Sequence, residues 1–202
     1  MPRFVSLPRD PAFYDESIDT CFIPLTKGKW AMVSGVDRDL AMSTWYAAPR
    51  KERCYAMRDI GSGHGRRVES LHRIIAGRLG VPIDGLDVDH INHDGLDNRR
   101  HNLRAATRTQ NNGNGRKPST NRSGYKGVSF HAKSGRWCAW LHFEGRSRYL
   151  GLFQHAVDAA RAYDREARRC FGSFACTNFP EDPVNDNSQH LVGEVGAGGV
   201  IG

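Results

Sequence analysis

Several features are missing from this 202-residue sequence, and each absence excludes a class of protein. It has no run of 18 apolar residues, so no segment is predicted to cross a membrane as a helix. The five cysteines are odd in number and never form a Cys-x-x-Cys pair, which excludes a zinc ribbon and argues against a disulfide framework. The N-terminal segment contains acidic residues and lacks the continuous apolar stretch of a signal peptide, so it is not expected to act as a secretory signal. These absences predict a reducing, cytosolic setting.

Acidic residues are also missing from one long part of the chain. From Asn98 to Phe143 there are 46 residues with ten Lys or Arg and no Asp or Glu, whereas 181–202 holds four acids and no Lys or Arg. The whole chain has a net charge of +7. An acid-free basic stretch is typical of a surface that meets a phosphate backbone. Ordinary solvated Lys and Arg side chains are the alternative interpretation.

The first 80 residues predict a loose arm, a strand-rich region and a helix. We expect a loose arm over 1–20, which holds three prolines, and a strand-rich region over 21–60 with turn signals between short apolar runs. Apolar residues recur at helical spacing from Val68 to Leu79, so a helix is predicted there. Gly80 and Pro82 end it.

The next region, 61–114, predicts two strands and a short helix. Strands are expected at Leu86–Ile91 and Leu103–Ala106, joined by a loop rich in Asn, Asp, Gly and Arg. Thr107 is a suitable N-cap for a helix that runs to about Asn112. The following segment, 115–122, has the Gly, Pro and basic composition of a flexible linker.

A small module is predicted over 123–180. Three strand runs are followed by a helix from Gln154 to Phe171, which Gly172 ends. Alanines on the inner face of this helix let it lie close to a sheet, which leaves the opposite sheet face open. The tail, 181–202, is expected to be disordered. The strand runs are Tyr125–His131, Arg136–Phe143 and Ser147–Phe153.

One group of polar residues suits phosphodiester hydrolysis. Asp89 and His90 are adjacent, Asn102 follows twelve residues after His90, and Asn111 nine after that. Hydrolysis needs a divalent cation to neutralise developing charge and a base that works near neutral pH, as histidine does. Asp and Asn oxygens suit a hard cation such as Mg²⁺, and Asn102 is placed to tie down the loop.

The segment VDHINHDGLDNRRHNLRAATRTQNN, preceded by Leu71-His72-Arg73, resembles the HNH homing endonucleases of the ββα-metal type. The resemblance implies His90 as general base, Asp89 and Asn111 as metal ligands, and Asn102 as the central asparagine. Asn112 remains open as an alternative to Asn111. Mg²⁺ is the implied cofactor, with Mn²⁺ also possible. His93 and His101 receive no role, and His72 is expected to be packed or to support the site.

Basic residues interleaved with aromatic ones predict the DNA-binding surface. Strand alternation places Arg136 and Trp140 on the open face and Trp137 in the core, where Phe130 and Phe143 are also expected. The residues assigned to DNA contact are Arg99, Arg100, Arg104, Arg108, Arg116, Lys117, Lys126, Arg136, Trp140, Arg146 and Arg148.

Residues 123–180 are similar to the AP2/ERF DNA-binding domain. The similarity lies in GYKGV, the Gly135-Arg136-Trp137 strand, YLGLF, the helix HAVDAARAYDREARRCFGS and TNFP. Ser129, His131 and Trp140 stand where the plant factors usually have charged residues, so the plant target preference does not transfer.

The predicted fold class is α+β, with a ββα-metal HNH module and a three-stranded antiparallel sheet packed on one helix. The predicted function is a site-preferring, metal-dependent DNA endonuclease that acts on double-stranded DNA as a monomer and nicks it. No membrane and no small-molecule substrate is expected, and the predicted location is the cytoplasm of a bacterial host or phage-infected cell. The alternative is a DNA-binding regulator without catalysis. An RNA-binding protein has only the charge in its favour.

Overall fold

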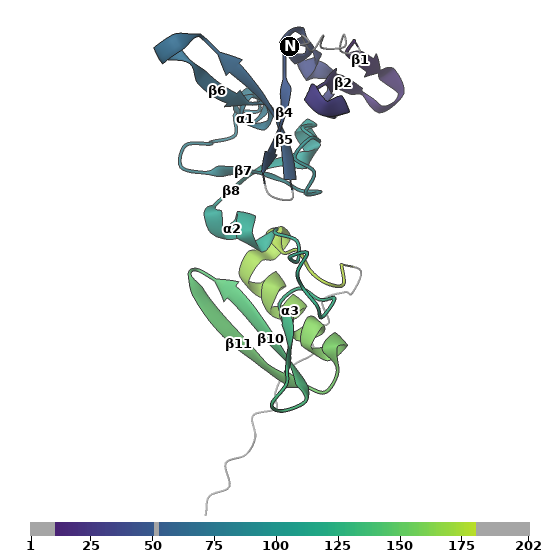
Figure 1. Cartoon of the computed structure of the whole chain (residues 1–202), viewed down its shortest axis with the longest axis vertical. Coiled ribbons are helices and arrows are strands. Elements are labelled where there is room, and N and C mark those ends of the chain that lie inside the picture. The colour runs from purple at the N-terminus through teal and green to yellow at the C-terminus, as the bar shows by residue number, and fades with distance from the viewer. Residues whose placement is uncertain (1–10, 51–52, 181–202) are drawn as a thin grey trace, which may run out of the picture.

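A computed structural model describes residues 11–50 and 53–180 (Figure 1). The first ten residues of the expected arm and the whole tail, 181–202, lie outside the described residues. The chain forms an upper part that runs from β1 to β8 and a lower part that contains β9 to β11 and α3, with α2 between them (Figure 1). Within 11–50 and 53–180, no helix is both long and apolar enough to cross a membrane.

The first sheet contains β1 (Phe13–Asp15), β2 (Thr20–Pro24) and β3 (Trp30–Ser34), all antiparallel. The Phe13 ring stacks on Phe22 of the neighbouring strand with ring centroids 4.7 Å apart. This cross-strand aromatic pair stabilises the edge of the sheet. Residues 13–15 are therefore a strand, where a loose arm was expected.

The second sheet has the order β4 (Tyr46–Arg50), β5 (Arg53–Ile60) and β6 (Arg67–Ser70), and α1 (Leu71–Arg78) follows directly. The helix was predicted from Val68, but Arg67–Ser70 pairs with β5 and leaves Val68 52% exposed. Tertiary strand pairing thus overrides the helical spacing for one turn. The sheets and α1 share one core, whose fully buried members include Ile23, Val33, Trp45, Ala56, Leu71 and Ile75.

A two-stranded sheet and a short helix follow. β7 (Asp87–His90) pairs antiparallel with β8 (Leu103–Ala106), and α2 (Arg108–Gly113) comes next. The Thr107 side chain accepts a hydrogen bond from the Gln110 amide, and the Gln110 side chain accepts one from the Thr107 amide. This reciprocal capping box fixes the start of α2, so the predicted N-cap is confirmed.

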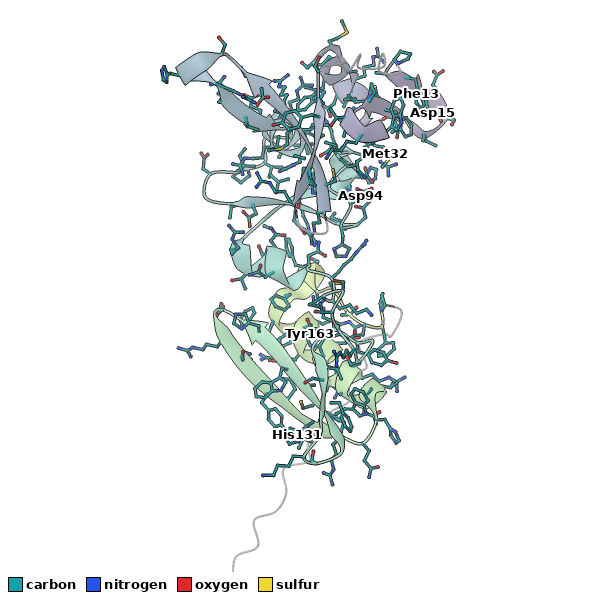
Figure 2. All side chains as sticks on the ribbon, viewed as in Figure 1. Phe13, Asp15, Met32, Asp94, His131 and Tyr163 are labelled. Atoms are coloured by element: carbon teal, nitrogen blue, oxygen red, sulfur yellow. The ribbon has the colours of Figure 1, made fainter. Side chains whose placement is uncertain are left out.

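The lower part is an antiparallel sheet of order β11-β10-β9 covered on one face by α3 (Ala156–Phe171). Its strands are β9 (Val128–His131), β10 (Arg136–Phe143) and β11 (Arg146–Phe153). Alanines on α3 bury against the sheet, and Tyr163 of α3 lies over Gly127, where no side chain fits (Figure 2). The predicted α+β class, with a ββα unit and a three-stranded sheet on one helix, is confirmed.

Two of the three aromatic residues expected in this core pack there. Trp137 and Phe143 are half-buried and pack against the core clusters. Phe130 is 54% exposed instead and meets Trp137 edge-on with centroids 5.1 Å apart, so this prediction was wrong. β9 is an edge strand, and although Phe130 pairs with Trp137 on the face that α3 covers, its ring remains mostly open to solvent.

The two parts of the molecule contact each other at Gly113, the last residue of α2. Its carbonyl accepts hydrogen bonds from Lys126 Nζ at 2.8 Å and from the Cys176 amide at 3.2 Å. A side chain at Gly113 would clash with the Phe171 ring. The segment predicted as a linker, 115–122, has no helix or strand.

Candidate functional site

Asp89 and His90 lie at the end of β7 and face opposite sides. Asp89 lies opposite Arg104 on β8, and His90 lies opposite Leu103. Both side chains are buried, with 1% of Asp89 and 3% of His90 exposed. Because adjacent strand residues alternate in direction, each has its own set of neighbours.

The His90 ring is held by Asn98. His90 Nε2 lies 3.3 Å from Asn98 Oδ1, and Asn98 Nδ2 donates to the Leu96 carbonyl at 2.9 Å. Asn98 Oδ1 can only accept, so this hydrogen bond places the imidazole proton on Nε2. Nδ1 is then the basic nitrogen of His90. Burial lowers the pKa of His90, so the ring is neutral near pH 7.

The loop that carries Asn98 is fixed to the first sheet. The Met32 amide donates to the Leu96 carbonyl and the Met32 carbonyl accepts from the Asn98 amide, both at 2.8 Å. Figure 2 shows Met32 of β3 above Asp94 of this loop. The strand-rich N-terminal region therefore positions the residue that orients His90.

Two further rings pack around His90. His72 of α1 meets it edge-on with centroids 5.3 Å apart, and Tyr55 of β5 lies 5.9 Å from it. Burial, with the charges of His90 and Arg73, lowers the pKa of His72 to about 3. His72 Nδ1 is buried and has no hydrogen-bond partner among the described residues. The expectation that His72 is packed beside the site agrees with this placement.

The Asp89 carboxylate is enclosed on the other side of β7. Asn114 Nδ2 lies 2.9 Å from both carboxylate oxygens, and Arg104 Nε and Nη2 each lie 2.9 Å from Oδ2. The Asp89 side chain has no exposed surface. Asn114 was not singled out from the sequence, although it lies three residues beyond Asn111, which is the spacing of one helix face.

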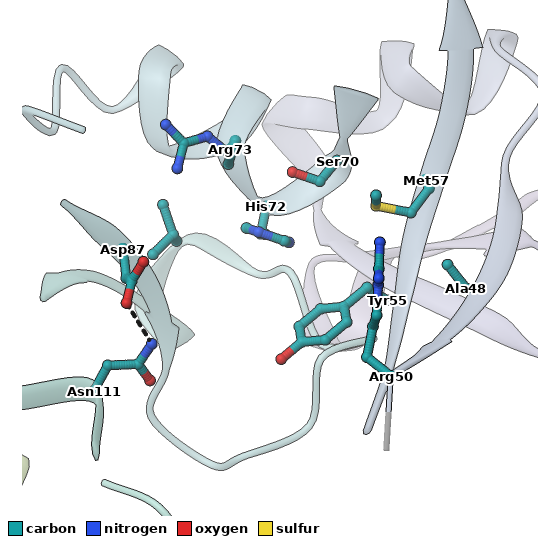
Figure 3. A pocket seen from close by; sticks show the side chains of 10 residues that line it. Ala48, Arg50, Tyr55, Met57, Ser70, His72, Arg73, Asp87 and Asn111 are labelled. Atoms are coloured by element: carbon teal, nitrogen blue, oxygen red, sulfur yellow. Dashed lines mark hydrogen bonds between the residues drawn. The ribbon is translucent and has the colours of Figure 1, made fainter. Parts of the chain in front are cut away.

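Asn111 contacts a different carboxylate. Its Nδ2 donates to Asp87 Oδ2 at 3.0 Å, as the dashed line in Figure 3 marks. Asp87 and Asp89 are two residues apart on β7, so they share a strand face. Asn112, the alternative, is exposed.

Asn102 is buried and fixes the loop between β7 and β8. Its Nδ2 donates to the Asp97 carbonyl at 2.7 Å and to Asn92 Oδ1 at 3.0 Å, and its Oδ1 accepts from the Asn92 amide at 3.0 Å. Both Nδ2 hydrogens and the Oδ1 of Asn102 thus make hydrogen bonds within the protein. Asn98, and not Asn102, makes the hydrogen bond to the His90 ring.

The two residues predicted as metal ligands have the chemistry of a hard-cation site. Asp89 and Asn111 offer carboxylate and amide oxygens, which Mg²⁺ and Mn²⁺ prefer. Across the described ranges there is no cluster of three or more His, Cys, Asp or Glu side chains arranged to hold a metal. The residue types fit a divalent cation, but Arg104 and Asn114 must release Asp89 before it can bind one.

Comparisons with known proteins agree with both resemblances. Residues 69–113 match the family model described as HNH endonuclease. The chain is 38% identical over 76 residues to an APETALA2-like protein of Oryza sativa subsp. indica. It is 44% identical over 64 residues to an AP2-like ethylene-responsive transcription factor of Arabidopsis thaliana. These alignments cover 38% and 32% of the chain but only 18% and 13% of the relatives, and no solved structure matches significantly.

The chain joins an HNH-type part to an AP2-like part. The first match indicates a nuclease role and the second a DNA-binding role. Since the chain spans less than a fifth of these two plant relatives, their whole-protein activities do not transfer to it.

Several arginines of the HNH-type part that were assigned to DNA contact are already paired with acids. Arg104 is bound to Asp89, and its Nη1 also donates to the Ser173 carbonyl at 2.9 Å. Arg108 lies 3.4 Å from Asp87, with 81% of its side chain exposed. Arg116 and Lys117 are exposed. The remaining pairs are Arg99 with Asp97 at 2.7 Å and Arg100 with Asp37 at 2.6 Å.

The AP2-like part presents its open sheet face. Arg136 and Trp140 are exposed there, and the Trp140 ring lies 4.9 Å from Tyr149. Arg146 is also exposed, but it pairs with Phe143 and so lies on the sheet face that α3 covers. Arg148 is half-buried and binds Glu166 at 3.0 Å. Lys126 is not on this face, because its Nζ donates to Gly113 at the contact between the two parts.

Proposed function

We propose that the protein is a site-preferring, metal-dependent DNA endonuclease of the HNH homing type. The HNH-type part cuts double-stranded DNA, and the AP2-like part positions it. The observation that carries the proposal is the pair Asp89 and His90 within the segment that matches the HNH endonuclease model, with His90 Nδ1 as a free basic nitrogen.

His90 is the proposed general base. Its neutral imidazole takes a proton from the attacking water at Nδ1 while Nε2 remains bonded to Asn98. Asn98 thereby keeps the basic nitrogen directed away from the loop. Asn102 holds that loop in place.

Asp89 and Asn111 are the proposed metal ligands, with Asn112 as the alternative. When bound, Mg²⁺ or Mn²⁺ would neutralise the negative charge that develops on the phosphate and on the leaving oxygen. The Asp89 carboxylate becomes available when Arg104 and Asn114 turn away from it.

The exposed arginines supply DNA affinity. Arg136 and Trp140 on the open sheet face read the target, while Arg108, Arg116, Lys117 and Arg146 contact phosphates. One active site per chain fits a monomer that nicks one strand. The proposed units are 61–114 for the nuclease and 123–180 for DNA binding, acting in the cytoplasm of a bacterial host or phage-infected cell.

A second candidate is a DNA-binding regulator without catalysis. One observation favours it: the Asp89 carboxylate is sealed by two donors and has no exposed surface. A protein that keeps this arrangement when bound to DNA cannot load a cation at Asp89.

A plasmid-relaxation assay separates the two candidates. The endonuclease proposal predicts that the wild-type chain converts supercoiled plasmid to nicked circles with Mg²⁺ and not with EDTA. His90→Ala should lower the rate about a hundredfold or more, since a positioned base contributes about that much. His101→Ala is the matched control, because His101 is exposed in the same loop and should cut normally. DNA binding without metal-dependent nicking would establish the regulator.

A further inference from the structure

A cavity of about 260 Å³ lies beside the His72 ring, on the side of β7 near α1 and the β4–β5 sheet (Figure 3). Its lining comes from β4, β5, β6, α1, β7 and α2, which are six separate elements. His90 and Asp89 do not line it. The cavity is therefore adjacent to the candidate catalytic residues but distinct from them.

The charge of the cavity wall is positive. Arg50 and Arg73 line it, and Asp87 is the only acid among the described residues of the lining. The Asp87 carboxylate is already engaged by Asn111 at 3.0 Å and Arg108 at 3.4 Å. Arg73 reaches only the Leu86 and Ile83 carbonyls, at 3.5 and 3.4 Å. Among residues 11–50 and 53–180, no carboxylate pairs with Arg50 or Arg73.

Uncharged donors complete the wall. Ser70 lines the cavity just before α1, and its hydroxyl makes no capping hydrogen bond to that helix. The Tyr55 hydroxyl points toward the centre of the cavity in Figure 3.

His72 also lines the cavity, and its Nδ1 is enclosed and has no hydrogen-bond partner among the described residues. A neutral imidazole carries one proton, and an unpaired buried N–H is costly, so the proton is favoured on Nε2. The cavity thus offers two guanidinium groups and three uncharged donors, which are the hydroxyls of Ser70 and Tyr55 and the N–H of His72. This combination matches the oxygens of a phosphate.

The position of this wall relates it to the cut site. His72 and His90 are neighbouring rings with centroids 5.3 Å apart. Phosphates of one DNA strand follow one another at about 3.4 Å of rise along the duplex. Because the two rings are neighbours, a strand whose phosphate reaches His90 can place a nearby phosphate of the same strand at the His72 wall.

We propose that this cavity binds a DNA backbone phosphate next to the cleaved bond, with Arg50 and Arg73 as its cations and His72 as a hydrogen-bond donor. The relation to the cleaved bond rests on the proposed function. The binding of a backbone phosphate does not, since it requires only that the protein engages DNA.

The test uses the full-length, ¹⁵N-labelled chain in EDTA, with inorganic phosphate as the probe. We expect saturable shifts of the His72 side-chain nitrogens and the Arg73 amide. Arg73→Gln should weaken phosphate binding by about tenfold or more, because a hydrogen bond between charged groups is lost. Arg50→Gln is the second variant, since Arg50 is exposed and tolerates substitution.

Arg67→Gln is the matched control. Arg67 lies on β6 with 71% of its side chain exposed, does not line the cavity, and carries the same charge change. An equal loss in Arg67→Gln and Arg73→Gln would overturn the proposal, as would the absence of saturable shifts.

A second experiment, a competition between DNA and inorganic phosphate, identifies the source of the phosphate that the cavity binds. A DNA duplex should compete with inorganic phosphate for the same resonances. If phosphate binds and the duplex leaves it in place, the cavity holds a free anion and the proposal is wrong. Since neither experiment measures cleavage, a chain that fails to nick plasmid can still pass both, and this would leave the phosphate site standing while the endonuclease proposal falls.

Discussion

The HNH-type and AP2-like parts use arginine in opposite ways. In the HNH-type part, Arg100 and Arg78 converge on Asp37, whose side chain has no exposed surface. In the AP2-like part, the exposed Arg136 and Arg146 have no paired carboxylate among the described residues. Arginines of the first kind hold the fold together, and those of the second kind are available to DNA.

This difference shows how an acid-free stretch of sequence can mislead. The stretch from Asn98 onward contains Arg99, Arg100 and Arg104, yet their partners come from outside it. Asp37 belongs to the 3₁₀ helix Gly35–Met42, more than sixty residues away. Local charge composition therefore does not distinguish a binding surface from a network of ion pairs.

The largest contrast between the two kinds of arginine should appear in stability. Burial alone raises the pKa of Asp37, but hydrogen bonds from Arg100 and Arg78 outweigh it and hold this pKa below its usual value. Asp37→Ala leaves Arg100 without its carboxylate and Arg78 with Asp39 alone. It should cost about 2–4 kcal/mol, less than for a fully buried pair because the arginines are partly exposed. Arg136→Ala should change stability by less than about 0.5 kcal/mol. Urea unfolding measures both, and equal losses would remove the contrast.

The next largest effect concerns the orientation of His90. Asn98→Ala removes the acceptor that places the His90 proton on Nε2, and should lower the cleavage rate by about tenfold, the equivalent of one lost hydrogen bond. Imidazole ¹⁵N spectra should show a mixture of tautomers in this variant. Asn98→Asp keeps the acceptor and should keep the Nε2–H form. Unchanged spectra in Asn98→Ala would mean that another group sets the tautomer.

A smaller effect is expected where the two parts meet. The Arg104 guanidinium binds Asp89, donates to the Ser173 carbonyl and lies 3.8 Å above the Phe174 ring. Arg104→Gln should raise Mn²⁺ affinity severalfold, because a cation that competes for Asp89 is removed. Calorimetric Mn²⁺ titration measures this change.

Arg108→Gln is the control for that titration. It removes the same charge at a mostly exposed site near Asp87 and should alter Mn²⁺ affinity less. Weaker Mn²⁺ binding by Arg104→Gln would show that Arg104 positions Asp89 for the metal and does not compete with it.

The smallest effect is a pH dependence within the AP2-like part. Hydrogen bonds from Arg169, and then from Arg148, lower the pKa of Glu166 to about 2. Its pKa in the unfolded chain is about 4.3, so its stabilising contribution is complete above that pH and is lost as the pH falls toward 2. Glu166→Gln should be less stable than wild type at pH 6, with the difference vanishing near pH 2. A constant difference across this range would exclude the charge as its cause.

The sequence was informative where local rules decide the structure. The capping box at Thr107 needs only Gln110, three residues away, and the strand Leu103–Ala106 was placed at its observed bounds. Similarly, the open and covered faces of β10 follow from alternation for Arg136 and Trp137, although a bulge after Ala139 shifts the register.

Long-range contacts account for what was missed. The first turn of the expected helix is a strand because Arg67–Ser70 finds a partner in β5. Asn98 and Asn114 acquire their roles only when the loop and the end of α2 fold back onto β7. Helix spacing relates Asn114 to Asn111, but it does not indicate that Asn114 contacts Asp89. The positions of Asp89, His90 and Asn102 in the fold are now known, and their catalytic roles remain predictions.

The most direct test of the proposed division of labour is single-turnover cleavage at saturating protein, measured together with DNA-binding titrations. His90→Ala should lose cleavage by about a hundredfold or more and keep its affinity. Arg136→Ala should lose about 1–3 kcal/mol of affinity for the preferred site and still cut at the wild-type rate once saturated. If both variants lose rate and affinity together, catalysis and recognition are not separated between the two parts, and the account is wrong.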